Sequence, residues 1–198
     1  MEQRNIIYIH GFRSSGDSGK AALMREAFPK VKILSPTLSP HPAEAIGQLE
    51  RLLAELPGRT LLVGTSLGGF YALYLSCRHG HACCAINPAW QADTSLARKG
   101  GVHTRYDSEE AYEFRREYLG ELTEMRDFIR KANQDPGLIN IFLSNDDEEL
   151  SFDGLETLVP ESRLLRRFDD SGHRFSRFPE ILDDIGGILE KLPEVRSV

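Results

Sequence analysis

The sequence contains few cysteines, and they form no recognisable framework. Cys77, Cys83 and Cys84 are an odd number, and two of them are adjacent within an apolar segment. No Cys-x-x-Cys pair or clustered Cys/His spacing is present, which argues against a zinc site. We therefore expect buried free thiols, as in a protein of a reducing compartment, and no bound metal.

Basic charge is also scarce, and long apolar runs are missing. The chain has 24 Lys and Arg residues against 30 Asp and Glu residues, a net charge of −6. A nucleic-acid binder needs a basic face for phosphates, and an anionic membrane attracts basic surfaces. The first apolar run, 6–9, is too short for a signal peptide, and no run approaches the about 20 residues of a membrane helix. We expect a cytoplasmic protein that binds neither nucleic acid nor membrane.

Short apolar runs alternate with helix-like segments along the 198 residues. The runs expected to be strands are 6–9, 31–34, 60–63, 82–86, 139–143 and 163–168, the last being the least apolar and expected near an edge. The segments expected to be helices are 20–28, 42–56, 67–78 and 178–192. This alternation predicts an α/β fold, with a mainly parallel sheet of about six strands covered by helices on both faces. The length suits a single domain over residues 1–198.

One interval breaks the alternation. Between Asn87 and Pro136 the sequence is polar and charged, with helical composition around 109–118 and 121–132. This is too long for a simple connection, so we expect a helical cap inserted at about 88–136; an ordinary crossover with two helices is the alternative. Its aromatic residues indicate an apolar face that rests either on the core or over a substrate pocket. They are Trp90, Tyr106, Tyr112, Phe114, Tyr118 and Phe128.

The strongest motif is Gly64-Thr65-Ser66-Leu67-Gly68, between an expected strand and an expected helix. It matches the G-x-S-x-G nucleophile elbow in the context that the motif requires. A serine on such a sharp turn is strained and exposes its hydroxyl above the sheet. The two glycines allow neighbouring backbone to approach without a Cβ clash. The motif predicts Ser66 as a nucleophile.

A serine hydroxyl needs a general base, and α/β-hydrolases supply the residues in the order Ser, Asp or Glu, His. His173 follows the last expected strand and precedes the last helix, where this order places the base. The acid should follow the strand at 139–143, where an acidic run begins. We assign Asp147 as the acid, with Asp146 as the alternative. Its task is to fix the imidazole tautomer and stabilise the imidazolium.

Negative charge that develops on a substrate oxygen must meet two oriented backbone N–H groups. One should belong to Leu67, directly after the nucleophile. We assign the other to Phe12, in the loop after the first strand, and we expect His10 to anchor that loop rather than act as a base. The nearby run 14–20 fails the phosphate-loop pattern, because positions 14 and 21 are Ser and Ala. We therefore expect no cofactor.

These segments resemble the small YqiA-type esterases of the α/β-hydrolase superfamily. The resemblance covers most of the chain except 91–135, and it rests on 8–12, 14–15, 20–21, 64–72, 86–89 and 172–175. It implies a compact hydrolase that lacks the first strands of the full fold and acts on acyl esters or acyl-CoA thioesters. The family acid lies in a Gly-Asp-Glu-Val-Leu-like run. Residues 146–150 align with that run so that Asp147 is the acid, although Asp146 replaces Gly and Glu149 replaces an apolar residue.

The sequence therefore predicts a cofactor-free serine hydrolase that forms an acyl-enzyme at Ser66. The same residues serve an esterase or a thioesterase, so the leaving group, the acyl length and the oligomeric state stay open. Two alternatives are a non-catalytic binding protein that kept the fold and a serine peptidase. The complete Ser/Asp/His set argues against the first. Nothing in the sequence points to the extended peptide-binding surface that the second needs.

Overall fold

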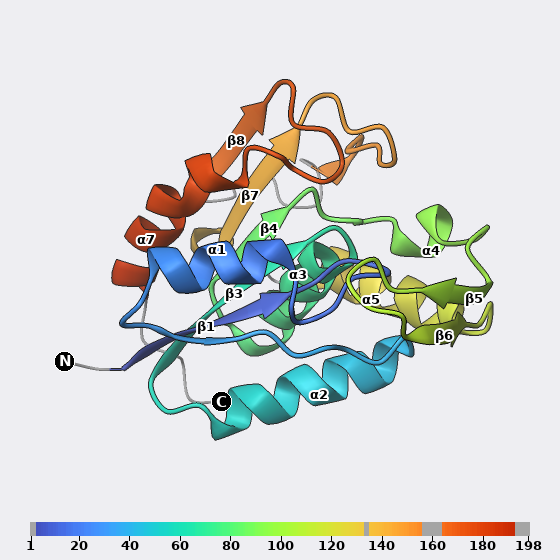
Figure 1. The fold of residues 1–198 in the computed structure, drawn as a ribbon, viewed down its shortest axis with the longest axis horizontal. Helices are drawn as coiled ribbons and strands as arrows, with labels where there is room; N and C mark the ends of the chain where they lie inside the picture. The colour runs from blue at the N-terminus through green and yellow to red at the C-terminus, as the bar shows by residue number, and fades with distance from the viewer. Residues whose placement is uncertain (1–2, 133–134, 156–163, 193–198) are drawn as a thin grey trace.

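The computed structural model describes residues 3–132, 135–155 and 164–192 (Figure 1). Its main sheet has the strand order β2-β1-β3-β4-β7-β8, and every pairing is parallel. The strands are β1 (Arg4–Ile9), β2 (Lys32–Leu34), β3 (Arg59–Thr65), β4 (Cys83–Ile86), β7 (Ile139–Ser144) and β8 (Leu164–Phe168). The predicted parallel α/β sheet is confirmed, and β8 lies at an edge as expected. Residue 163, the expected start of β8, is outside the described residues.

Helices cover both faces of this sheet because alternate strand residues point to opposite sides. Ile7 and Ile9 belong to the apolar cluster under α2, α3 and α5, whereas Ile6 and Tyr8 belong to the cluster under α1 and α7 (Figure 1). None of the described helices is long and apolar enough to cross a membrane. The helices are α1 (Gly19–Ala27), α2 (Pro42–Glu55), α3 (Leu67–His79), α4 (Ala92–Ser95), α5 (Tyr118–Lys131) and α7 (Leu182–Glu190), with 3₁₀ turns η1 (Pro136–Leu138) and η2 (Phe178–Ile181).

The cysteines are free thiols, as expected. Cys83 and Cys84 are fully buried on opposite faces of β4, and Cys77 is half-buried in α3. Burial raises the pKa of Cys83 to about 12. Because the thiolate is the reactive form, these cysteines act as small apolar core residues.

The segment between β4 and β7 differs from the expected all-helical insertion. The helix expected at 121–132 is confirmed as α5, but the helix expected at 109–118 is wrong. There the chain forms an antiparallel hairpin of β5 (Gly101–Thr104) and β6 (Ala111–Phe114). The two aromatic residues of β6, Tyr112 and Phe114, are two positions apart and so share one face of the strand, and both rings contact the ring of Phe12. Contacts with a distant loop therefore outweigh a local composition that suits a helix.

The ends of β1 and β3 and the start of α3 meet at very close range. A Cβ on Gly64 would lie 2.1 Å from the carbonyl oxygen of Gly68. A Cβ on Gly68 would lie 2.0 Å from the carbonyl oxygen of Ile9. Both obstacles are backbone atoms of the sheet or the helix, so they cannot rotate away. Glycine at 64 and 68 is what allows α3 to begin against the end of β1.

We expect Gly68→Ala to destabilise the fold by about 1–3 kcal/mol, because the new methyl group forces the helix away from β1. Gly120→Ala is the matched control, since Gly120 lies in α5 and its Cβ would meet no atom within 4 Å. That change should be neutral or stabilise by up to about 1 kcal/mol through helix propensity. Urea unfolding of both variants measures the difference, and equal stability would contradict the steric argument.

Candidate active site

Ser66 occupies a strained turn between β3 and α3. Its backbone has φ 56° and ψ −121°, a region that residues with a side chain rarely adopt. Hydrogen bonds hold it there: its N–H donates to the carbonyl of Ile86 at 2.9 Å, and its carbonyl accepts from Phe70 at 3.1 Å and Ala89 at 3.0 Å. The expected sharp turn between a strand and a helix is therefore formed, at the carboxyl ends of the strands.

His173 and Asp147 come together from the loops after β8 and β7. Nδ1 of His173 lies 2.9 Å from Oδ2 and 3.0 Å from Oδ1 of Asp147. The Asp147 side chain is only 1% exposed, and Oδ1 also accepts from the amides of residues 149–150. Burial acts to lower the pKa of His173, but the hydrogen bond and charge of Asp147 and the nearby carboxylates together raise it. A carboxylate thus fixes the ring and favours its protonated form.

Two neighbouring carboxylates bind the backbone of the same loop. Oδ1 of Asp146 accepts from the amides of residues 171–172 at 3.1 and 3.2 Å. The hydroxyl of Ser144 and these two amides lower the pKa of Asp146 to about 2. Oε2 of Glu148 accepts from the N–H of His173 at 2.8 Å. Both carboxylates position the backbone that carries the imidazole.

Asn87 also holds this loop, which the sequence did not indicate. It is fully buried after β4 with φ 40°. Its Nδ2 donates to the carbonyls of Gly172 at 3.0 Å and His173 at 3.2 Å, and its Oδ1 accepts from the N–H of Ser144 at 2.7 Å. The available signal was Asn followed by Pro88 directly after a strand, because Asn tolerates a positive φ.

A cavity of about 800 Å³ lies over the carboxyl ends of the strands. Ser66 and His173 both line it, but within the described ranges the Ser66 hydroxyl has no hydrogen-bond partner, so it is not bonded to His173. Such contacts often tighten only when substrate binds. Phe12 and Leu67 line the same cavity. In the part of the chain that the structure describes, no cluster of three or more His, Cys, Asp or Glu side chains could hold a metal ion.

The inserted segment contributes one wall of the cavity. Among its aromatic residues, Tyr106 lines the cavity, whereas Trp90 and Phe114 are buried in the core. Tyr112 and Tyr118 pack against that core. Phe128 is partly exposed and contacts the ring of Tyr74. The further insertion residues on the cavity wall are Ser95, Leu96, Lys99, His103 and Asp107.

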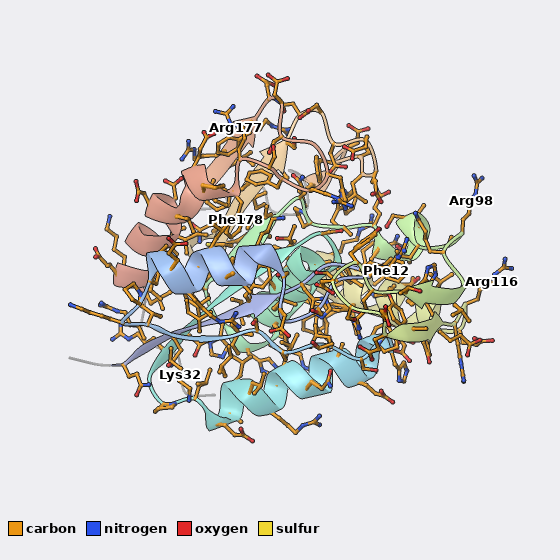
Figure 2. All side chains as sticks on the ribbon, in the orientation of Figure 1. Phe12, Lys32, Arg98, Arg116, Arg177 and Phe178 are labelled. Atoms are coloured by element: carbon orange, nitrogen blue, oxygen red, sulfur yellow. The ribbon has the colours of Figure 1, made fainter. Side chains whose placement is uncertain are left out.

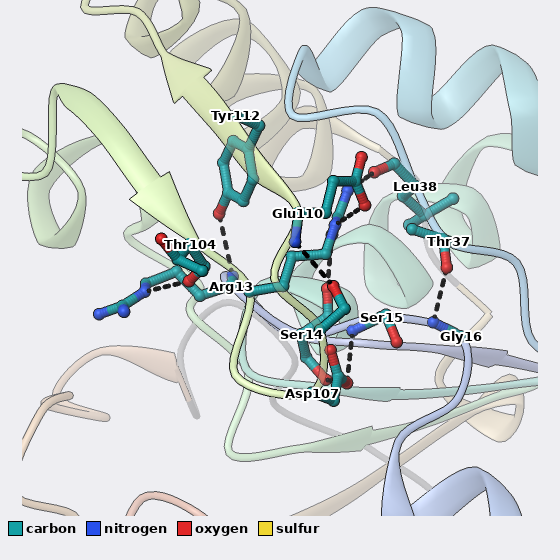
Figure 3. Close-up of polar contacts among 12 residues, drawn as sticks. Arg13, Ser14, Ser15, Gly16, Thr37, Leu38, Thr104, Asp107, Glu110 and Tyr112 are labelled. Atoms are coloured by element: carbon teal, nitrogen blue, oxygen red, sulfur yellow. Dashed lines mark hydrogen bonds and ion pairs between the residues drawn. The ribbon is translucent and has the colours of Figure 1, made fainter.

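The β5-β6 hairpin also holds the loop that carries Phe12 (Figure 3). Arg13, with φ 64°, donates its N–H to the hydroxyl of Tyr112 at 3.1 Å. Its carbonyl accepts from the N–H of Tyr106 at 2.7 Å. Two residues further along the loop, the N–H of Ser15 donates to the carboxylate of Asp107 at 3.0 Å. The hairpin thus fixes the backbone on both sides of Arg13.

The amides of Phe12 and Leu67 lie in backbone that is fixed on one side by the hairpin contacts of Arg13 and on the other by the Ser66 turn. Neither donates a hydrogen bond to another group in the described segments, and both residues border the cavity that Ser66 lines. A Cβ on Gly11 would lie 3.2 Å from the Cβ of Ser66, so the loop passes directly beside the serine. Two free donors beside a serine hydroxyl suit a developing oxyanion.

His10 anchors the start of this loop, as expected. Its Nε2 accepts from the N–H of Leu38 at 3.0 Å, and its Nδ1 donates to the carbonyl of Gly11 at 2.8 Å. Burial lowers the pKa of His10. Because one ring nitrogen must accept, these bonds require the neutral ring, which is a structural role.

Solved structures with the same architecture share little sequence with this chain. A putative hydrolase from Agrobacterium vitis S4 is 20% identical, with a TM-score of 0.73 over 94% of this chain and 88% of that chain. Est1E from Butyrivibrio proteoclasticus is 12% identical, with a TM-score of 0.69 over 96% and 90%. A structure from work on LipS and LipT, two metagenome-derived lipolytic enzymes, is 18% identical, with a TM-score of 0.69 over 96% and 94%. These likenesses show the α/β-hydrolase fold.

A family model gives the closer relationship. It matches residues 5–189, nearly the whole length, and is described as "Uncharacterised protein family (UPF0227)". The match includes the elbow, the Phe12 loop, the acidic run and His173. The chain therefore belongs to UPF0227, the YqiA-like esterase family that its motifs resemble.

Proposed function

We propose that this protein is a serine hydrolase that cleaves carboxylic ester or acyl thioester bonds through Ser66, His173 and Asp147. One observation carries the proposal: the buried Asp147 carboxylate is bonded to Nδ1 of His173, and the cavity beside this ring is also lined by the strained Ser66. The names of the neighbouring esterases and lipolytic enzymes support it by analogy of fold.

The acylation step follows from this geometry. Asp147 accepts a hydrogen bond from the Nδ1–H of His173, which keeps the proton on Nδ1 and leaves the lone pair of Nε2 able to take a proton. The Ser66 oxygen attacks the acyl carbon, its proton passes to Nε2, and the carbonyl electron pair moves onto oxygen. The amides of Phe12 and Leu67 stabilise that oxyanion. When the carbonyl re-forms, the bond to the alkoxide or thiolate breaks, and the leaving group takes the proton from His173.

Deacylation uses the same groups with water as the nucleophile. His173 accepts a proton from water as the water oxygen bonds to the acyl carbon, and the oxyanion returns to the same two amides. Collapse breaks the bond to the Ser66 oxygen, which recovers its proton from His173. The products are a carboxylic acid and free enzyme, and the cycle balances without a cofactor.

We also propose that residues 88–136 act as a cap on a single domain. This segment supplies Leu96, Lys99 and Tyr106 to the cavity wall, while its hairpin bonds to Arg13 beside the Phe12 amide. The cap would therefore limit the size of the substrate and hold one of the two oxyanion donors. A cavity of about 800 Å³ suits a small acyl ester or the acyl end of an acyl-CoA-like molecule.

We expect Ser66→Ala to lower kcat for p-nitrophenyl ester hydrolysis by several orders of magnitude, because no other group replaces the nucleophile. Labelling by a fluorophosphonate probe should disappear in the same variant. Circular dichroism and thermal unfolding provide the control, since the Ser66 hydroxyl has no hydrogen-bond partner among the described residues to lose. Wild-type turnover by a folded Ser66→Ala protein would refute the mechanism.

We expect Asp147→Asn to lower kcat by roughly 10⁴-fold, because an amide favours the wrong imidazole tautomer. Asp146→Asn is the matched control one residue away. Its remaining amide oxygen can still accept from the amides of residues 171–172, so the loss should be much smaller. The measurement is kcat on one p-nitrophenyl ester for both variants. A larger loss in Asp146→Asn would move the acid to position 146.

The raised pKa of His173 predicts the pH profile. A general base must be neutral, so kcat/KM should rise with pH through a pKa above the ordinary histidine value. Replacing Asp147 by Asn removes the charge that raises this pKa. The ascending limb of the pH profile, where kcat/KM rises, should therefore move to lower pH in Asp147→Asn. Initial rates between about pH 5 and pH 9 measure both limbs. A limb that moves to higher pH in Asp147→Asn would contradict this assignment.

A further inference from the structure

Lys20 and Arg174 lie next to each other beside the reaction cavity. Both line the cavity together with Ser66 and His173. Nζ of Lys20 donates to the carbonyl of Arg174 at 2.6 Å, so the ammonium reaches the residue that directly follows His173. It also lies 5.8 Å from the ring centre of Phe178, which is labelled in Figure 2.

Neither cation is matched by an acid. Among the residues that the structure describes, no carboxylate lies within ion-pair distance of Lys20 or of Arg174, although other cations of this acidic chain are paired. Arg105 pairs with Glu110 at 2.7 Å, for example. The guanidinium of Arg174 instead lies 5.4 Å from the ring centre of Tyr106.

The position of Lys20 is electrostatically unfavourable in the free protein. Burial and the charge of Arg174 lower its pKa. Lys20 is also in the first turn of α1, where a positive charge opposes the helix dipole and no acidic residue compensates. An anion bound between the two side chains would relieve each of these costs.

Two of the three acidic groups that line the cavity accept hydrogen bonds from the protein. Asp107 accepts from the N–H of Ser15 and the hydroxyl of Ser14, and Glu148 accepts from the N–H of His173. The third, Glu149, is exposed. A ligand in the cavity can therefore bind Lys20 and Arg174 without displacing a carboxylate of the described residues.

We propose that the preferred substrates carry a carboxylate or phosphate close to the scissile ester bond, and that Lys20 and Arg174 bind this anion. The proposal rests on the proposed function and specifies its substrate class. Because Lys20 is bonded to the residue next to His173 and lines the same cavity as Ser66, we place the anion near the reacting carbonyl.

Two pairs of esters test this, one for each side of the scissile bond. On the acyl side, mono-p-nitrophenyl adipate is compared with p-nitrophenyl heptanoate, which has similar length and no charge. On the leaving-group side, 4-carboxyphenyl butyrate is compared with its methyl ester. We expect wild-type kcat/KM, corrected for spontaneous hydrolysis, to favour the anionic member of at least one pair. The pair that shows the preference identifies the side that carries the anion.

Lys20→Gln and Arg174→Gln should each lower the anionic-to-neutral ratio of kcat/KM by about tenfold, the effect of one lost charge-assisted hydrogen bond. Lys32→Gln is the control. Lys32 is an exposed lysine at the start of β2, paired with the start of β1 and so at the opposite end of the strands from Phe12 (Figure 2). Its ratio should equal that of the wild type.

Hydrolysis of the neutral esters with no anionic preference in either pair would overturn this proposal and leave the proposed function standing. A preference that persists in both Lys20→Gln and Arg174→Gln would also overturn it. If the folded wild type hydrolyses none of the four esters, the proposed function itself fails, and this proposal fails with it.

Discussion

The close approach of backbone at Gly64 and Gly68 is the constraint on which the site depends. It lets α3 start against β1 and bends the chain so sharply that Ser66 takes a positive φ. Such a conformation persists only where the surroundings over-determine it, and here the hydrogen bond that Ser66 donates to Ile86 and the one that it accepts from Ala89 do so. The same turn leaves the Leu67 amide without a partner in the described chain. One steric condition therefore exposes the hydroxyl and orients a donor beside it.

A second set of contacts fixes the position of His173. The loops after β4, β7 and β8 are separate in sequence, and Asn87 joins them through its amide group. Asp147 binds the His173 ring, while its two sequence neighbours bind the backbone of the same loop. Asp146 accepts from the N–H of Ser171, and Glu148 accepts from the N–H of His173. Each carboxylate accepts from a defined donor, so three adjacent negative charges are accommodated. An imidazole held on both its ring and its backbone loses little freedom when substrate binds.

The predictable parts of this protein are those with a local signature. The six strands followed from apolar runs, and the Ser66 turn followed from two glycines at a fixed spacing between a strand and a helix. The hairpin at 101–114 was not predictable, because its second strand lies in a stretch of helical composition and both strands contact Phe12, far away in the chain. The roles of Asn87 and Asp146 arise only where three loops meet. Residue spacing in a single sequence does not reveal contacts between loops that are far apart in the chain.

The hairpin links the shape of the cavity to the geometry around the scissile bond. Tyr106 lines the cavity with its side chain, and its N–H bonds to the carbonyl of Arg13. The guanidinium of Arg13 lies 4.4 Å from the centre of the Tyr106 ring, which the guanidinium of Arg174 also contacts. A ligand that moves Tyr106 must therefore strain the backbone next to the Phe12 amide. In the proposed mechanism, substrate fit and the alignment of the Phe12 donor are then set by one element, so a change in this hairpin should alter specificity and rate together.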